Sequence, residues 1–225
     1  MTWTPNTVTV VSLVLGSRQI ADMQNTQFCT DTEIVGYLDI GYRKLYNHVV
    51  NRFENYYVSE QNITLVPSQE EYDLPTDFFK LLGCDMFRSG LAYTMRPWSL
   101  NERNRVTFSY NGTPLRYILK AGKIVFKPIP ATTDYIKMYY IPSPAELTLG
   151  SSVEVFNGFD EYVMLDAAIK MKQKEESDVS ILAGKQAEIL QLIFETLAGR
   201  DAGQPQKMTD VEKMNDNLLF PFWGL

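Results

Sequence analysis

Few residues in this chain have the types and spacing that catalysis requires. The single histidine, His48, is followed by Val49 and Val50, and no GxSxG or comparable nucleophile motif accompanies it. One histidine is also too few for a metal site built on histidine ligands. We therefore interpret His48 as a structural or surface residue, and we expect no catalysis, no essential metal and no cofactor.

Carboxylates and thiols give no stronger indication of chemistry. The acidic pairs Asp160-Glu161 and Glu175-Glu176 are adjacent in sequence, so their side chains point in different directions around a helix and do not face each other. The first pair falls near a predicted helix start, where negative charge is favourable. Cys29 and Cys84 belong to no CxxC motif, and we expect both to be reduced, buried thiols.

The overall composition is that of a globular protein. The 225 residues are 45% hydrophobic and 21% charged, with a net charge of −6 and with 13 Tyr and 12 Phe. A chain of this length can bury a core without disulfides or metals. The longest apolar stretch near the N-terminus, Val8 to Leu15, is far too short to cross a bilayer. We therefore expect synthesis in the cytoplasm and no membrane partner.

Charge is distributed unevenly along the chain. Residues 88–137 carry nine basic and two acidic side chains, whereas residues 157–201 carry five basic and nine acidic ones. Aromatic residues such as Tyr93 and Tyr110 are interleaved with the basic ones. A protein interface is the favoured interpretation of this segment, with DNA contact and plain solvation as alternatives. The basic residues singled out as interface candidates are Arg96, Arg103, Arg105, Arg116, Lys120 and Lys123.

Helical patterns flank the middle of the chain on both sides. Thr30 and Glu33 have the spacing of a capping box, and an apolar stripe from Val35 to Phe53 predicts a helix over residues 30–54. Three further helices are predicted over residues 11–24, 159–176 and 179–197. The residues expected in the shared core are Leu38, Leu45, Val49, Val163, Ala167 and Ile193.

The middle of the chain has the texture of β-structure. Eight prolines between residues 56 and 149 exclude long helices there. Strands are predicted over residues 62–66, 70–74, 115–119, 123–128 and 135–141, with Ala121-Gly122 as a hairpin turn. Residues 78–82 are predicted to form a short helical or irregular turn, and residues 98–105 an exposed loop.

These patterns predict an α+β fold in three parts. Residues 1–56 and 157–201 would pack together as a small helical bundle, residues 57–156 would form a β-rich insertion, and residues 202–225 an extended C-terminal tail. The tail ends in a cluster of apolar residues that would be an aggregation risk if left in water. We expect this cluster to bind a partner, with folding back onto the bundle as the alternative. Its members are Leu218, Leu219, Phe220, Phe222, Trp223 and Leu225.

Several segments, in order from Ile20 to Asp210, resemble the head-to-tail connector proteins of tailed bacteriophages, also called adaptors or head-completion proteins. No single segment is a catalytic signature, and the resemblance depends on their number and order. Those that carry it include Ile20-Ala21-Asp22-Met23, the stretch from Tyr72 to Gly83 (YDLPTDFFKLLG), Ile141-Pro142-Ser143-Pro144 and Asp166-Ala167-Ala168-Ile169-Lys170.

The resemblance implies a structural virion protein at the head–tail junction, with no catalytic residues. Such adaptors form a ring, commonly of twelve copies, that joins the portal to a tail or nozzle protein and lets double-stranded DNA pass without specific binding. The apolar C-terminal cluster would then dock on the portal or on a neighbouring subunit. The alternatives are another neck or tail-tube protein, or a DNA-binding packaging factor that uses residues 88–137. A cell-wall hydrolase would need a carboxylate pair that we do not find.

Overall fold

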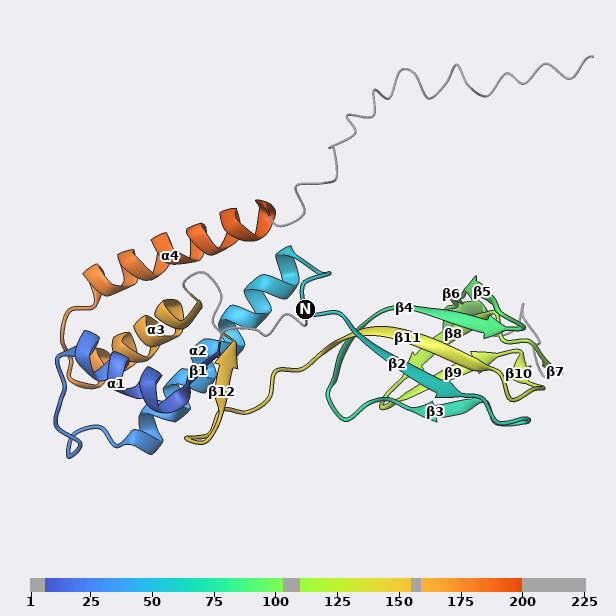
Figure 1. Cartoon of the computed structure of the whole chain (residues 1–225), viewed down its shortest axis with the longest axis horizontal. Helices are drawn as coiled ribbons and strands as arrows, with labels where there is room; N and C mark the ends of the chain where they lie inside the picture. Colours follow the sequence, from blue (N-terminus) through green and yellow to red (C-terminus); the bar gives the residue numbers. More distant parts are fainter. Residues whose placement is uncertain (1–6, 103–109, 155–158, 200–225) are drawn as a thin grey trace, which may run out of the picture.

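The computed structural model describes residues 7–102, 110–154 and 159–199. Figure 1 shows an elongated molecule with its helices at one end and its β-sheets at the other. This arrangement is an α+β fold, as predicted. The expectations for Arg103, Arg105 and the C-terminal tail lie outside the described residues.

The helices form where apolar stripes and caps predicted them. Thr9 Oγ1 accepts a hydrogen bond from Ser12 N at the start of α1, and Thr30 Oγ1 accepts one from Glu33 N at the start of α2. Thr30 is thus the predicted cap, while the Glu33 carboxylate accepts from Lys174 and Tyr37. The helices are α1 (Val10–Ala21), α2 (Asp31–Arg52), α3 (Phe159–Lys174) and α4 (Ser180–Gly199).

The first hydrophobic core lies among these helices. Within it, α3 contacts α1, α2 and α4, and Figure 1 shows α4 as the outermost of them. The six residues predicted as core are all buried, and each is at most 2% exposed. At the end of α2, Phe53 and His48 contact the ring of Phe194 on α4. The short strands β1 (Thr7–Thr9) and β12 (Ser152–Glu154) pair beside this core.

Two four-stranded sheets make up the other end of the molecule. One has the strand order β2-β11-β4-β5 and the other β3-β9-β8-β6. A second hydrophobic core contains Met86, Ile136 and Met138 from the first sheet and Ile124 and Phe126 from the second. The sheets therefore pack face to face. The strands are β2 (Ser59–Thr64), β3 (Glu71–Asp73), β4 (Phe78–Arg88), β5 (Leu91–Thr94), β6 (Arg96–Pro97), β8 (Arg116–Lys120), β9 (Lys123–Lys127) and β11 (Tyr135–Pro142), with a small parallel pair β7 (Asn111–Gly112) and β10 (Ile129–Pro130).

The predicted strands are present, with shifted ends, and Ala121-Gly122 is the turn between β8 and β9. The prediction for residues 78–82 is wrong, because they begin the eleven-residue strand β4. Register shifts in the pairing of β4 with β11 interrupt the two-residue alternation that marks a strand in sequence. Of the loop predicted over residues 98–105, residues 103–105 lie outside the described part of the chain. Residues 99–101 are exposed as predicted, whereas Trp98 is half-buried and a 3₁₀ turn spans Leu100–Glu102.

A small third cluster joins the two ends. Tyr46 and Val50 of α2 pack against Ile141 of β11, with Tyr57 and Leu82 beside them. The Tyr46 hydroxyl donates a hydrogen bond to the carbonyl of Pro142. This cluster holds the end of α2 against the last strand of the first sheet. The division into domains at residues 56 and 157 stays a prediction.

Candidate protein-interaction sites

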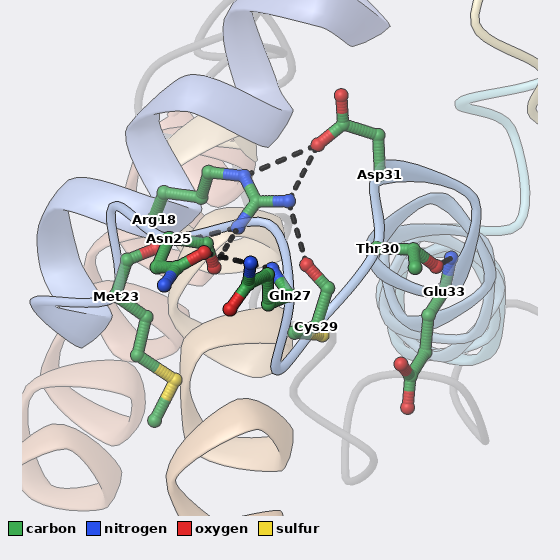
Figure 2. Close-up of polar contacts among 8 residues, drawn as sticks. All are labelled: Arg18, Met23, Asn25, Gln27, Cys29, Thr30, Asp31 and Glu33. Carbon is green, nitrogen blue, oxygen red and sulfur yellow. Dashed lines mark hydrogen bonds and ion pairs between the residues drawn. The ribbon is translucent and has the colours of Figure 1, made fainter.

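A buried arginine organises the loop between α1 and α2 (Figure 2). Arg18, in the last turn of α1, is 4% exposed. Its Nη2 donates to the carbonyl of Cys29 at 2.7 Å and its Nη1 to the carbonyls of Met23 and Asn25, each at 3.3 Å. Nη2 also lies 2.5 Å from Asp31 Oδ1, at the start of α2. Burial of a guanidinium is costly unless its donors are partnered, and these contacts partner them.

The loop that Arg18 holds presents its side chains to solvent. Residues 24–28 are all exposed, whereas Met23 and Cys29 on either side are buried. Asn25 Oδ1 accepts from Gln27 N at 2.9 Å, which fixes the turn within the loop. An exposed loop with an ordered backbone loses little conformational entropy on binding a partner, so this loop is a candidate contact surface.

The same end of the molecule is tied to α3. Lys174 Nζ donates to both Glu33 carboxylate oxygens at 2.8 Å and to the carbonyl of Phe28 at 2.9 Å, and it lies 5.1 Å from the centre of the Phe28 ring. Hydrogen bonds from Lys174 and Tyr37 lower the pKa of Glu33. Burial and the bond to Glu33 in turn raise the pKa of Tyr37 to about 12.

A second buried charge links three helices. Asp166 of α3 is 5% exposed and accepts from Lys170 at 2.5 Å, from Gln186 of α4 at 3.0 Å and from Lys44 of α2 at 3.3 Å. Burial raises the pKa of this carboxyl, but the hydrogen bonds from Lys170 and Gln186 and the charges of the two lysines outweigh it. The pKa of Asp166 therefore lies below its ordinary value.

Neither Arg18 nor Asp166 was predicted to have a role, although the position of each in the sequence indicates burial. Arg18 lies on the apolar stripe of α1, four residues after Val14 and three before Ala21, and Asp166 lies among the apolar residues of a helix predicted to be buried. A charge on an apolar stripe indicates a paired, buried group.

The four described interface candidates, residues 96, 116, 120 and 123, lie on strands β6, β8 and β9 of the second sheet. Arg96 on β6 and Arg116 on β8 are register neighbours, with Arg96 exposed. Lys120 and Lys123, on either side of the hairpin turn, lie 3.0 Å and 3.6 Å from the carboxylate of Glu71 on β3. Both lower the pKa of Glu71, chiefly through the hydrogen bond from Lys120.

Other basic residues of residues 88–137 are paired in the same way. Lys127 pairs with Glu70, Lys137 with Glu60 at 2.9 Å, and Arg88 lies 3.7 Å from Asp134. Most of the acidic partners precede residues 88–137 in the chain. Residues 57–156 as a whole carry ten basic and ten acidic side chains. Residues 57–156 therefore carry no net charge, and a net positive charge that would attract DNA in general is not found there.

A shallow pocket of about 210 Å³ lies on the outer face of this sheet. Ile118, Val125, Trp98 and Leu100 give it apolar walls, and the Glu70–Lys127 and Glu71–Lys120 pairs lie around it. Within the described ranges, the buried Trp98 Nε1 has no hydrogen-bond partner. An apolar pocket surrounded by ion pairs is a feature that a simply solvated sheet face would not need.

Groups that could do chemistry are few in the part of the chain that the structure describes. No cluster of three or more His, Cys, Asp and Glu residues there could hold a metal ion. Cys29 and Cys84 are buried and free, and burial raises the pKa of Cys84 to about 12 and also that of Cys29. Such thiols are poor nucleophiles. No helix among these residues is both long and apolar enough to span a bilayer.

Comparison with protein families decides which class of protein this geometry belongs to. The family model described as SU10 adaptor protein matches residues 11–209. The chain belongs to the SU10 adaptor protein family. The resemblance to phage head-to-tail connectors is thereby confirmed, and the protein is a structural adaptor protein of a bacteriophage and a virion component. No curated protein matches the sequence.

The match covers most of the features described above. In this SU10 adaptor protein, the Arg18 loop, the Asp166 cluster and the basic segment all fall within the matched residues. The apolar C-terminal cluster, residues 218–225, falls beyond them. Features within residues 11–209 can therefore be related to the family, whereas a role for the terminal cluster can be argued only from its physical chemistry.

Proposed function

We propose that the protein is a subunit of a ring, of twelve copies, that joins the portal to a tail or nozzle protein at the neck of the phage particle. The match to the SU10 adaptor protein family over residues 11–209 carries this proposal. A ring needs two different faces on each subunit. The helical end with its ordered loop, and the sheet that bears residues 96, 116, 120 and 123, are surfaces of different chemistry at opposite ends of the molecule.

The ring would leave a channel through which double-stranded DNA passes without specific binding. A basic channel wall would hold the phosphates, whereas an acidic or neutral wall lets the duplex slide. We therefore expect the acidic helical part to lie nearer the channel than most of the basic residues of the insertion. The balance of charge within residues 57–156 gives no support to the alternative of a DNA-binding packaging factor.

The apolar C-terminal cluster would anchor the adaptor on the portal, with a neighbouring subunit as the second choice. Residues 206–217 are polar, and twelve extended residues span at most about 40 Å, so they give the cluster reach. Each aromatic side chain buried in a partner groove could contribute on the order of 1.5–3 kcal/mol, less the cost of ordering the tail. We propose no catalytic role for any residue.

Electron cryomicroscopy of the protein mixed with purified portal would test the proposal. The expected result is a ring of adaptor subunits seated on the portal, with an open axial channel. Truncation after Asn217 should leave a folded subunit with an unchanged circular dichroism spectrum that no longer binds portal. If the intact protein does not bind portal but binds duplex DNA with a steep salt dependence, the result would favour the alternative function of a DNA-binding packaging factor.

A further inference from the structure

Helix α4 is more apolar than its position at the surface requires. Two of its large apolar residues, Ile193 and Leu197, are buried, and Leu182, Ile189 and Leu190 are partly buried against the helical core. About a third of a turn around the helix from these residues, Ile181 is 73% exposed and Leu192 is 55% exposed. Exposed apolar residues beside the buried stripe make this part of α4 a candidate contact surface.

An exposed stripe of α4 has the residue spacing of a coiled-coil seam, with an apolar residue at each end and two charged residues between them. Ile181, Lys185, Glu188 and Leu192 follow one another at intervals of four, three and four residues, which places them in one stripe along the helix. All four side chains are exposed. Gly184 flanks the stripe and leaves room for another backbone, because nothing lies within 4 Å of the position that a Cβ atom would take there.

The order of residues in this stripe is self-complementary. The stripe is symmetric about the point between Gln186 and Ala187, so that an antiparallel copy places an apolar residue opposite an apolar one and a lysine opposite a glutamate. We propose that α4 pairs with α4 of a second copy of the chain in this antiparallel arrangement, around a two-fold axis. Ile181 then packs against Leu192 of the second copy and Lys185 pairs with its Glu188, and each contact occurs twice.

Charge selects this partner and this direction. A parallel pair in register would place Lys185 against Lys185 and Glu188 against Glu188, and like charges at such distances are unfavourable. Elsewhere on the chain, the exposed stripe of α1, formed by Val11, Leu15 and Gln19, carries no charge that could pair with Lys185 or Glu188. A second α4 satisfies both the apolar and the charged positions.

The α4 pair belongs to the free subunit, since a two-fold contact closes on itself and does not generate a ring. It covers apolar surface before the subunit meets its assembly partners. Only four residues from each helix form the seam, so the interface is small and the dimer is weak and concentration-dependent. The proposal does not depend on the ring or on portal binding.

Sedimentation velocity of the full-length chain over a concentration series tests the pairing. Lys185→Glu and Glu188→Lys should each raise the dimer dissociation constant by about tenfold or more, because each variant replaces two attractive charge pairs by repulsive ones. The double variant, which exchanges the two charges, should restore dimerisation. Gln19→Glu, which adds a charge to the exposed face of α1, is the matched control and should change nothing.

Cysteine cross-linking tests the direction of the pair. A mixture of the Ile181→Cys and Leu192→Cys chains should form a disulfide-linked dimer, whereas each variant alone should not, because identical positions lie far apart in the antiparallel arrangement. The native Cys29 and Cys84 are buried and do not interfere. Links between identical positions, cross-linked species larger than dimers in the mixture, a monomer at every concentration, or a double charge exchange that fails to restore the dimer would each overturn the proposal.

Discussion

Arg18 should be one of the most costly residues in the helical end to remove. Its guanidinium donates to the carbonyls of Met23 and Cys29 in buried surroundings and to that of Asn25 in partly buried ones. A buried polar group that loses its hydrogen-bond partner costs about 1–3 kcal/mol, and the Met23 and Cys29 carbonyls would both lose theirs. Because the exposed loop can relax toward water, we expect Arg18→Met to lower the free energy of unfolding by about 3–5 kcal/mol in total.

Urea denaturation followed by circular dichroism measures this loss, and two further variants divide it. Asp31 is about half-exposed, so Asp31→Asn should cost about 1 kcal/mol or less. The exposed neighbour Gln19→Ala is the control and should stay within about 0.5 kcal/mol of the parent. In hydrogen exchange, the amides of residues 22–30 in Arg18→Met should exchange through local opening, at urea concentrations below those that unfold the whole protein. A loss under about 1 kcal/mol with unchanged exchange in the loop would refute the argument.

Three shorter predictions concern the core, the acid response and the histidine. Leu45 is 2% exposed, so Leu45→Ala should cost about 2–5 kcal/mol in urea denaturation, and a loss under half a kcal/mol would mean that the site is not core. The pKa of Asp166 is lowered, so its stabilising contribution is present above about pH 4 and is lost as the pH falls through the folded-state pKa; Asp166→Asn should flatten that part of the stability–pH curve. His48→Ala removes a contact with Phe194 and should leave particle assembly intact, scored by electron microscopy and plaque counts; assembled but non-infectious particles would contradict this.

Local patterns predicted the helices well because helix formation depends on residues three or four positions apart. The apolar stripe of α2, which includes Leu38, Leu45 and Val49, and the cap at Thr30 just before the helix could each be recognised without knowledge of the elements that pack against them. The start of β4 could not be recognised in this way. Residues 78–82 become a strand because they pair with β11, whose register partners lie about sixty residues away in the chain.

The candidate sites were harder to predict than the elements that carry them. The positive charge of residues 88–137 was evident, but its neutralisation by Glu60, Glu70 and Glu71 depends on strand pairing between distant segments. Asp166 likewise depends on Lys44, more than a hundred residues earlier, and on Gln186. The charged residues can be counted from the sequence, but the residues that pair with them depend on how the strands and helices are arranged in the fold.

The antiparallel pairing of β2 with β11 has a further consequence for how the protein can change. Ser59, near the point where the chain enters the sheets, is the register partner of Tyr140, near the point where it leaves them. A segment whose two ends lie side by side can be lengthened, shortened or exchanged without moving the ends of α2 and α3 apart. The sheets between Ser59 and Tyr140 can therefore change in length or sequence while the two connections to the helices stay where they are.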